Sequence, residues 1–189
     1  MIINNMFENF KKLFRYKKVK ETNTMNTTID PNEKLSNNFK LQEFLKSQTA
    51  SRKNIDNTPD SMALTNIRTL VEGLLQPLRS DVGHPLIVTS GYRSPELNSA
   101  IGGSDTSQHT KGEAVDIEST ELTNIELAEK IKNEYDFDQL ILEFYNPDEG
   151  PNSGWVHVSY KEHTNRKEIL TAMKVNGKTQ YFYGIKTEN

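Results

Sequence analysis

Hydrophobic positions in the first half of the chain recur at helical spacing. Beyond Thr58, apolar residues three or four positions apart continue for about five turns: Leu64, Ile67, Leu70, Val71, Leu74, Leu75 and Leu78. This spacing predicts one long amphipathic helix whose apolar stripe lies in the core, rather than a partner-binding face. Thr58 suits the N-cap and Pro59 the first helical position, and Pro77 and Gly83 indicate where the helix ends.

Shorter helices are predicted on either side of this one. Leu41, Phe44 and Leu45 favour a short helix, followed by a polar loop through residue 56. Ser94 and Pro95 favour a second helix start, and the glycines at 102–103 indicate its end. The capping box at residues 123–126 favours a third helix, which runs to about residue 134.

The second half of the chain is dominated by predicted strands. They cover residues 85–89, 113–118, 138–145, 155–160, 168–175 and 178–183. Asn176 and Gly177 lie between the last two strands and form the favoured two-residue hairpin turn. We therefore predict an α+β fold, with helices packed on a mostly antiparallel sheet.

Alternation in two of these strands places polar side chains together. In the earlier strand, alternation places Leu140, Leu142 and Phe144 on one face and Ile141, Glu143 and Tyr145 on the other. In the later strand, it places Val156 and Val158 on a common face. If the two strands pair across the loop near residue 150, the aliphatic residues form one core face. Glu143 and His157 then lie close together on the opposite face.

The N-terminus carries a different pattern. Residues 1–20 combine apolar positions at helical spacing with lysines and an arginine gathered at the far end. This favours a basic amphipathic segment that contacts an anionic membrane surface or a protein partner. The alternative is an appendage without function, upstream of a true start at Met25. Residues 21–34 are polar and predict a linker, so the domain is expected to cover residues 35–189.

Composition narrows the classes of protein and site. The 189 residues fit one domain, the net charge of −3 gives no reason to expect a nucleic-acid partner, and we expect a monomer. The chain has no cysteine, so a metal would be held by His, Asp or Glu. No apolar run approaches the roughly 20 residues that cross a bilayer, and the N-terminus lacks the pattern of a secretory signal.

Two histidines and one aspartate form a candidate zinc site. His109 precedes Asp116 by seven positions, and His157 lies on the later apolar strand. Gly112 and Ala114 are small and allow close backbone approach, and a short strand then presents the carboxylate back toward the loop of His109. Two imidazoles and one carboxylate leave the fourth tetrahedral position of zinc for water, as in catalytic sites.

These residues also resemble a known signature. The spacing Ser107-x-His109-x-x-Gly112-x-Ala114-x-Asp116, followed by Trp155-x-His157, is similar to that of the zinc D-Ala-D-Ala carboxypeptidases and L-Ala-D-Glu endopeptidases. That group shares its fold with the hedgehog signalling domain. Residues 90–94 and 102–104 resemble the small members found in phages, and the resemblance covers about residues 35–183.

The resemblance implies roles for individual residues. His109, Asp116 and His157 would be the zinc ligands. Arg93 would match the arginine that pairs with a substrate carboxylate, the alternative being an exposed helix-start arginine. Two further residues would contact the substrate. Ser107 would bind it or order the ligand loop, or simply form a turn, and Trp155 would line the cleft unless it is a half-buried core residue.

The general base departs from part of this family. Several relatives carry an acidic residue or histidine a few positions before the last ligand, but position 154 is glycine here. We predict that Glu143 replaces it, because strand pairing brings Glu143 to the face of His157. Asp148, Glu149 and His163 are weaker candidates. Alternatively, Glu143 is only a solvated carboxylate and the enzyme is inactive.

The expected function is hydrolysis of peptidoglycan stem or cross-link peptides by a Zn²⁺ metallopeptidase of the phage type. Such a protein would be made in the cytoplasm and would act on the cell wall after lysis-type release or as a virion component. The competing hypothesis is a non-enzymatic virion or cell-wall-binding domain with a structural zinc. Whether a carboxypeptidase or an endopeptidase activity applies is left open by the sequence.

Overall fold

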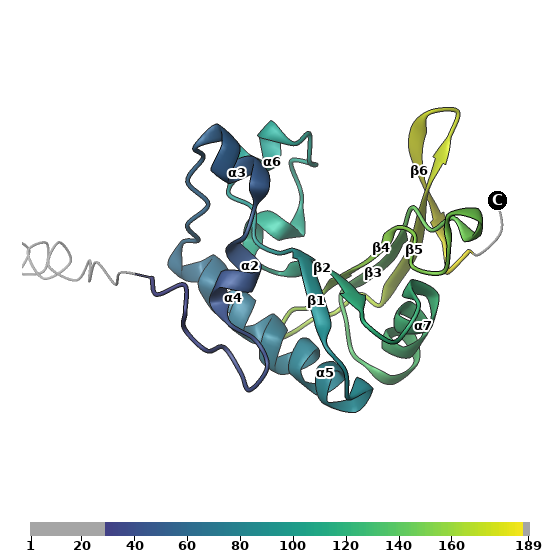
Figure 1. Ribbon diagram of the computed structural model, residues 1–189, viewed down its shortest axis with the longest axis horizontal. Coiled ribbons are helices and arrows are strands. Elements are labelled where there is room, and N and C mark those ends of the chain that lie inside the picture. Colours follow the sequence, from purple (N-terminus) through teal and green to yellow (C-terminus); the bar gives the residue numbers. More distant parts are fainter. Residues whose placement is uncertain (1–28, 187–189) are drawn as a thin grey trace, which may run out of the picture.

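The computed structural model describes residues 29–186 (Figure 1). The predicted segment 1–20, and the linker up to residue 28, lie outside this range. Within the described range, no helix has the length and apolar character that a membrane crossing requires.

Six strands of the described chain form one sheet with the order β1-β2-β4-β3-β5-β6. Every neighbouring pair is antiparallel except β3 and β5, which are parallel. The prediction of a mixed fold with a mostly antiparallel sheet is therefore confirmed. The strands are β1 (Leu86–Ser90), β2 (Ala114–Ser119), β3 (Gln139–Glu143), β4 (Trp155–Ser159), β5 (Glu168–Val175) and β6 (Lys178–Tyr183).

The long predicted helix is present, but it begins at a different residue from the predicted one and continues past Pro77. It consists of α4 (Ser61–Leu70), a π-helical segment η1 (Val71–Leu75) and α5 (Gln76–Val82). Asp60, not Thr58, is the N-cap, because its side chain accepts a 2.7 Å hydrogen bond from the backbone of Ala63.

Pro77 lies inside this helix instead of ending it. A proline has no N–H and normally breaks the ladder of hydrogen bonds. The π turn shifts that ladder just before the proline, since the N–H of Gln76 bonds to Val71 five residues earlier. The helix then ends at Gly83, which has a φ of +75°.

The remaining helices are short apart from α7. One of them, α3, lies in the segment predicted as a polar loop, where Ser47 caps it. The capping box at Thr123 and Glu126 opens α7 as predicted. These elements are α2 (Leu41–Leu45), α3 (Gln48–Lys53), α6 (Pro95–Ala100), the 3₁₀ turns η2 (Gln108–Lys111) and η3 (Pro147–Glu149), and α7 (Asn124–Glu134).

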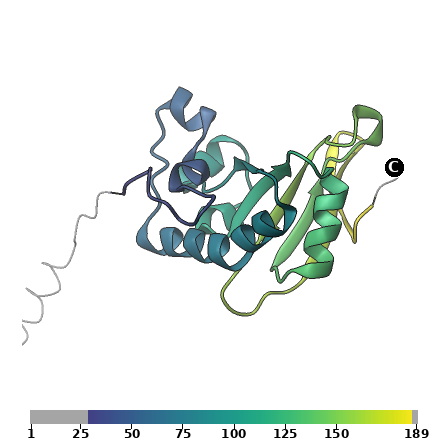
Figure 2. The ribbon, with the colours of Figure 1, turned by 60° about the horizontal axis from the view of Figure 1, so that its bottom comes forward.

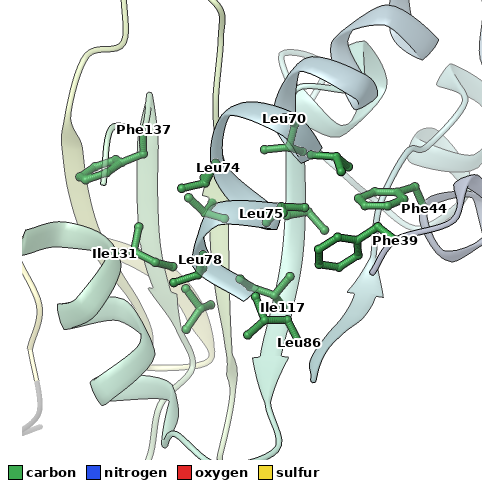
Figure 3. Packing of buried hydrophobic residues seen from close by; sticks show 14 of the residues in the cluster. Phe39, Phe44, Leu70, Leu74, Leu75, Leu78, Leu86, Ile117, Ile131 and Phe137 are labelled. Carbon is green, nitrogen blue, oxygen red and sulfur yellow. The ribbon is translucent and has the colours of Figure 1, made fainter. Parts of the chain in front are cut away.

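The long helix and α7 cover one face of the sheet (Figure 2). Their leucines and isoleucines form one buried cluster with the aliphatic side chains of the central strands; Figure 3 shows Leu74 and Leu78 of the long helix between Ile131 of α7 and Ile117 of β2. Burial of this apolar surface stabilises the fold. Because successive strand residues alternate between the two faces, the polar side chains of these strands lie together on the opposite face.

The predicted pairing of residues 138–145 with 155–160 is confirmed. Ile141 lies opposite His157, and Glu143 lies opposite Trp155. The predicted alternation stops at Glu143, however, where the strand ends. Tyr145, predicted on the face of Glu143, packs against the core. Phe144, predicted on the core face, adopts a φ of +54°. This left-handed conformation turns its ring to the polar face, beside Trp155.

Gly112 fixes the loop that precedes β2 against the long helix. Its φ is +73°, and a Cβ there would lie 2.3 Å from the carbonyl oxygen of Ala63 in α4. The sequence prediction that glycine at this position allows close backbone approach is therefore confirmed.

A comparison of Gly112→Ala with Gly83→Ala separates the cost of a left-handed alanine from the cost of the contact with α4. Gly83 has nearly the same φ, +75°, but a Cβ added there would meet nothing within 4 Å. Gly83→Ala should lower the free energy of unfolding by about 1–2 kcal/mol, the cost of a left-handed alanine. Gly112→Ala should cost at least about 1–3 kcal/mol more, because α4 must shift. Urea denaturation measures both, and equal losses would show that the contact with α4 has no energetic role.

Candidate metal centre

Three buried side chains bring their ligand atoms into one small triangle. The Nε2 atom of His109 lies 3.2 Å from the Nδ1 atom of His157 and 3.2 Å from the Oδ1 atom of Asp116. The Nδ1 atom of His157 lies 2.9 Å from the same Oδ1 atom. All three side chains are at most 8 % exposed. Three electron-pair donors buried this closely are complementary to a cation.

Two of the three residues are positioned by strand register. Asp116 on β2 lies directly opposite His157 on β4, so that their side chains share one face of the sheet. His109 comes from the 3₁₀ turn η2, which the backbone contact of Gly112 holds against α4. Asp116 also lies opposite Ser90, at an irregularity in the β1–β2 pairing.

A backbone carbonyl determines which ring nitrogen of His109 carries the proton. The Nδ1 atom of His109 lies 2.7 Å from the carbonyl oxygen of Gly91, so Nδ1–H donates and Nε2 keeps its lone pair for a ligand. The backbone of Gly91 is itself fixed, because a Cβ there would lie 2.5 Å from the oxygen of Phe44 in α2. This hydrogen bond orients the imidazole toward Asp116 and His157.

The triangle fits zinc in size and chemistry. A tetrahedral ion with bonds of about 2.0–2.1 Å separates its ligand atoms by roughly 3.3 Å. The three observed separations, 2.9, 3.2 and 3.2 Å, lie close to that value. The two imidazoles and one carboxylate are the ligand types of catalytic zinc sites, which keep a fourth position open.

The electrostatics of Asp116 also favour a cation. Burial alone would raise the pKa of its carboxyl group, but the charges and hydrogen bonds of His109 and His157 outweigh it and hold the pKa far below its usual range. The carboxylate is therefore ionised throughout the physiological pH range.

Arg93 binds the outer oxygen of this same carboxylate. Its Nη2 atom lies 2.9 Å from Oδ2 of Asp116, and Nε and Nη2 both donate to Ser90. The side chain is 17 % exposed and lines the cleft. Arg93 therefore orients Asp116, a candidate metal ligand, and the alternative that it is an exposed arginine at a helix start is wrong. The substrate carboxylate suggested for it would have to share the guanidinium with Asp116.

Glu143 lies on the face of the triangle, as the predicted pairing requires, and lines the same cleft. Burial raises the pKa of Glu143 above its usual value, and the charge of Asp116 adds to this effect, while His157 and Arg93 oppose it. A carboxylate with a raised pKa beside a metal-ligand set is suited to proton transfer.

The backbone explains why position 154 carries no base. Gly154 has a φ of +68°, and a Cβ there would lie 1.9 Å from the carbonyl oxygen of Glu143. No side chain fits this contact without movement of β3. The carboxylate that lines the cleft on the strand paired with β4 is instead that of Glu143.

The other predicted site residues have mixed positions. Ser107 lines the cleft and its carbonyl accepts two hydrogen bonds from Thr110, but its side chain forms no cap bond. Trp155 is half-buried and borders the cleft, and its ring lies tilted against that of Phe144, with ring centroids 5.3 Å apart. The weaker base candidates Asp148, Glu149 and His163 do not line the cleft, and the His163 side chain is 83 % exposed.

The cleft extends well beyond the residues that sequence reasoning found. Its volume is about 1040 Å³, and it continues from the triangle across β3 and β5 to β6. Phe144, Leu170, Lys174 and Tyr181 line this extension. The pairing of β5 with β3, and of β6 with β5, places Leu170, Lys174 and Tyr181 there.

An ion pair around the buried Asp138 also holds η2, the turn that carries His109 and is called the ligand turn below. Asp138 is fully buried, and its carboxylate accepts hydrogen bonds from Gln108 (2.9 Å) and Arg166 (2.7 Å) and lies 2.8 Å from the Lys161 ammonium. Burial alone would raise the pKa of Asp138, but these contacts outweigh it and hold the pKa well below its usual range. Because Gln108 precedes His109, this pair links η2 to the start of β3.

Comparison with known protein families gives one result for this chain. A family model described as Peptidase M15 matches residues 37–159, which include the triangle, Arg93 and Glu143. A search of curated protein sequences gave no significant match.

We predict that the triangle binds one zinc ion per chain. His109→Ala and His157→Ala should each weaken zinc binding by more than about 100-fold, since loss of a direct ligand exceeds the 10–100-fold loss typical of outer contacts. Competition with a chromophoric chelator measures this affinity. His163→Ala should bind zinc as the unaltered protein does, because its side chain is exposed and remote from the cleft. Equal affinity in all three variants would place the metal elsewhere.

We also predict that Asp138 contributes stability that acid removes. A carboxylate with a depressed folded-state pKa stabilises the fold above its unfolded pKa of about 3.9, and this contribution is lost as the pH falls through the lower folded value. Asp138→Asn should therefore lower the free energy of unfolding at pH 7 by about 2–4 kcal/mol, as expected when a buried ion pair loses one partner. The deficit should shrink below pH 3 in urea denaturation. A deficit that is constant from pH 7 to pH 2 would contradict an electrostatic origin.

Proposed function

This chain belongs to the peptidase M15 family, and we propose that it is a zinc-dependent hydrolase of peptidoglycan stem or cross-link peptides, cleaving a bond that involves a D-amino acid. The observation that carries this proposal is the triangle of His109, Asp116 and His157, which is buried at the base of a large open cleft. A structural zinc site is closed by four protein ligands, whereas this group offers three.

The chain's own residues suit metal-assisted hydrolysis. His109, Asp116 and His157 would hold the zinc ion. When bound there, zinc would lower the pKa of a water molecule toward about 7 and polarise the scissile carbonyl. Asp116 keeps its orientation through Arg93, and His109 keeps its lone pair through Gly91.

Glu143 is the proposed general base. Its carboxylate borders the cleft on the strand beside β4, and burial raises its pKa above the usual value, which makes it a stronger proton acceptor than an exposed carboxylate. In hydrolysis it would accept the proton of the attacking water and pass it to the amine that leaves. No other carboxylate in the matched region combines this position with a pKa raised by burial.

Three further residues have proposed substrate roles. Arg93 would pair with a substrate carboxylate while retaining its contact with Asp116, and Trp155 would form part of the cleft wall. Ser107 would order the ligand turn through its backbone and offer its hydroxyl to the substrate. Their places in the cleft lining support these roles.

We further propose that the protein is of the phage type, with a hedgehog-like peptidase fold, and acts as a monomer. It would reach the cell wall after lysis-type release or as a virion component. The competing function is a non-catalytic wall-binding domain, and the raised pKa of Glu143 beside an open cleft favours the enzyme over it.

The test of the base is Glu143→Gln. This variant keeps the size of the side chain but cannot accept a proton, so kcat for release of amine ends from purified peptidoglycan should fall by about 10²–10⁴-fold. Zinc content and thermal unfolding should stay unchanged. Asp148→Asn and Glu149→Gln serve as matched controls, because both carboxylates lie outside the cleft lining.

Three results would contradict this assignment. A Glu143→Gln variant with unaltered kcat would show that Glu143 is not the base. Hydrolysis by the protein after removal of zinc with a chelator would overturn the metal mechanism. Full binding of cell walls without cleavage by the unaltered protein would favour the wall-binding domain.

A further inference from the structure

The cleft has a second end on a hairpin outside the part of the chain that the family model matches. That match stops at residue 159, whereas β5 and β6 cover residues 168–183. The two strands join at Asn176 and Gly177, both with positive φ, and extend the sheet on the side of β3 (Figure 1).

Strand register brings this hairpin into line with the candidate base. Glu143 lies opposite Ala172 on β5, and Ala172 lies opposite Tyr181 on β6, so that all three share the face of the cleft. The side chain of Ala172 between them is small and fully buried. Burial, followed by the charge of Glu143, raises the pKa of Tyr181, so the phenol remains a hydrogen-bond donor at neutral pH.

Two aromatic side chains, Trp155 and Phe144, form a row between the metal ligands and the ammonium of Lys174. The ring of Trp155 lies tilted against that of Phe144, and the Lys174 ammonium lies 5.1 Å from the centre of the Phe144 ring. Lys174 also donates a 2.8 Å hydrogen bond to Thr179 across the hairpin. These contacts hold the ammonium at the cleft wall, where its charge faces the open space.

Lys174 differs from most other cations of the cleft. Arg93 is bound to Asp116, and Lys161 and Arg166 are bound to Asp138. Within residues 29–186, Lys174 forms no ion pair with a carboxylate, a property it shares with Lys111 beside the ligand turn. Only Lys174 is joined to the aromatic row. Its charge is therefore available to an anionic group of a bound molecule.

The distance between the two ends matches a short peptide. Three strand spacings of about 4.8 Å separate β4 from β6, or roughly 14 Å across the sheet. An extended peptide covers that length in about four residues. A peptide whose scissile bond lies at the metal centre can thus reach the hairpin.

We propose that Lys174 and Tyr181 form a substrate subsite that binds a free carboxylate of the peptide, about four residues' length from the metal ligands. The ammonium neutralises the carboxylate, and the tyrosine donates a hydrogen bond or packs against the peptide beside it. This inference rests on the proposed function, because it takes the bound molecule to be the peptide that the metal centre hydrolyses.

The test compares one peptide in two forms. A soluble stem peptide is prepared with a free carboxylate about four residues from the bond that would lie at the metal centre and, separately, with that group as a carboxamide. Binding to the zinc-loaded Glu143→Gln protein is measured by calorimetry, so that turnover does not interfere. The carboxylate form should bind about 5-fold more tightly, and Lys174→Gln should remove that preference, since this is the upper end of what an exposed ion pair contributes.

Matched variants come from the same hairpin. Lys178→Gln removes an exposed ammonium on the other face of β6, and Tyr183→Ala removes a tyrosine that is 81 % exposed and lies outside the cleft lining. Both should keep the preference. In the otherwise unaltered enzyme, Lys174→Gln and Tyr181→Ala should raise KM about 5-fold with kcat changed less than about two-fold, the pattern of a uniform binding contact. Equal melting temperatures and zinc contents exclude a folding defect.

The outcomes separate this inference from the proposed function. If the enzyme cleaves peptidoglycan but Lys174→Gln retains both the carboxylate preference and KM, the subsite is wrong and the peptidase function stands. If neither form binds, or if both bind equally to the protein with Lys174 intact, the subsite is also wrong. If the preference depends on Lys174 but no peptidoglycan is cleaved, the subsite stands and the hydrolytic function fails.

Discussion

The pairing of β2 with β4 is the constraint on which the metal centre depends. Asp116 and His157 lie directly opposite one another in this antiparallel register, on the face that the core helices leave free. A slip of either strand by one residue would turn its ligand into the apolar layer beneath and place the two side chains on opposite faces. The burial of Val115, Val156 and Val158 against those helices therefore fixes the register and, with it, the positions of two ligands.

Much of this arrangement could be predicted because it follows from local periodicity. Alternation between residues 140 and 143, and again around His157, was enough to predict the β3–β4 hairpin and the shared face of Glu143 and His157. The Asn176–Gly177 turn and the Thr123 capping box depend on a few neighbouring residues, and both were identified correctly. The meeting of His109 with the two strand ligands followed from the resemblance and agrees with the geometry.

The remaining features depend on contacts between distant parts of the chain. The carbonyl of Gly91 that orients His109 is held by Phe44, about 47 positions earlier, and periodicity gives no signal for such a contact. The π turn before Pro77 changes the hydrogen-bond ladder of a helix whose apolar pattern is almost unaltered. Lys174 and Tyr181 enter the cleft only through the parallel pairing of β5 with β3, which joins strands that are not consecutive.

Phe144 shows how the site and the stability of the fold oppose each other. A left-handed backbone at a residue other than glycine costs about 1–3 kcal/mol, which the surrounding structure must offset. Glycine or asparagine at this position would relieve the backbone, and with it the ring that joins Trp155 to Lys174 would be lost. Selection for thermal stability alone would thus favour replacing Phe144, and its ring would be kept only where the contacts with Trp155 and Lys174 are of use to the protein.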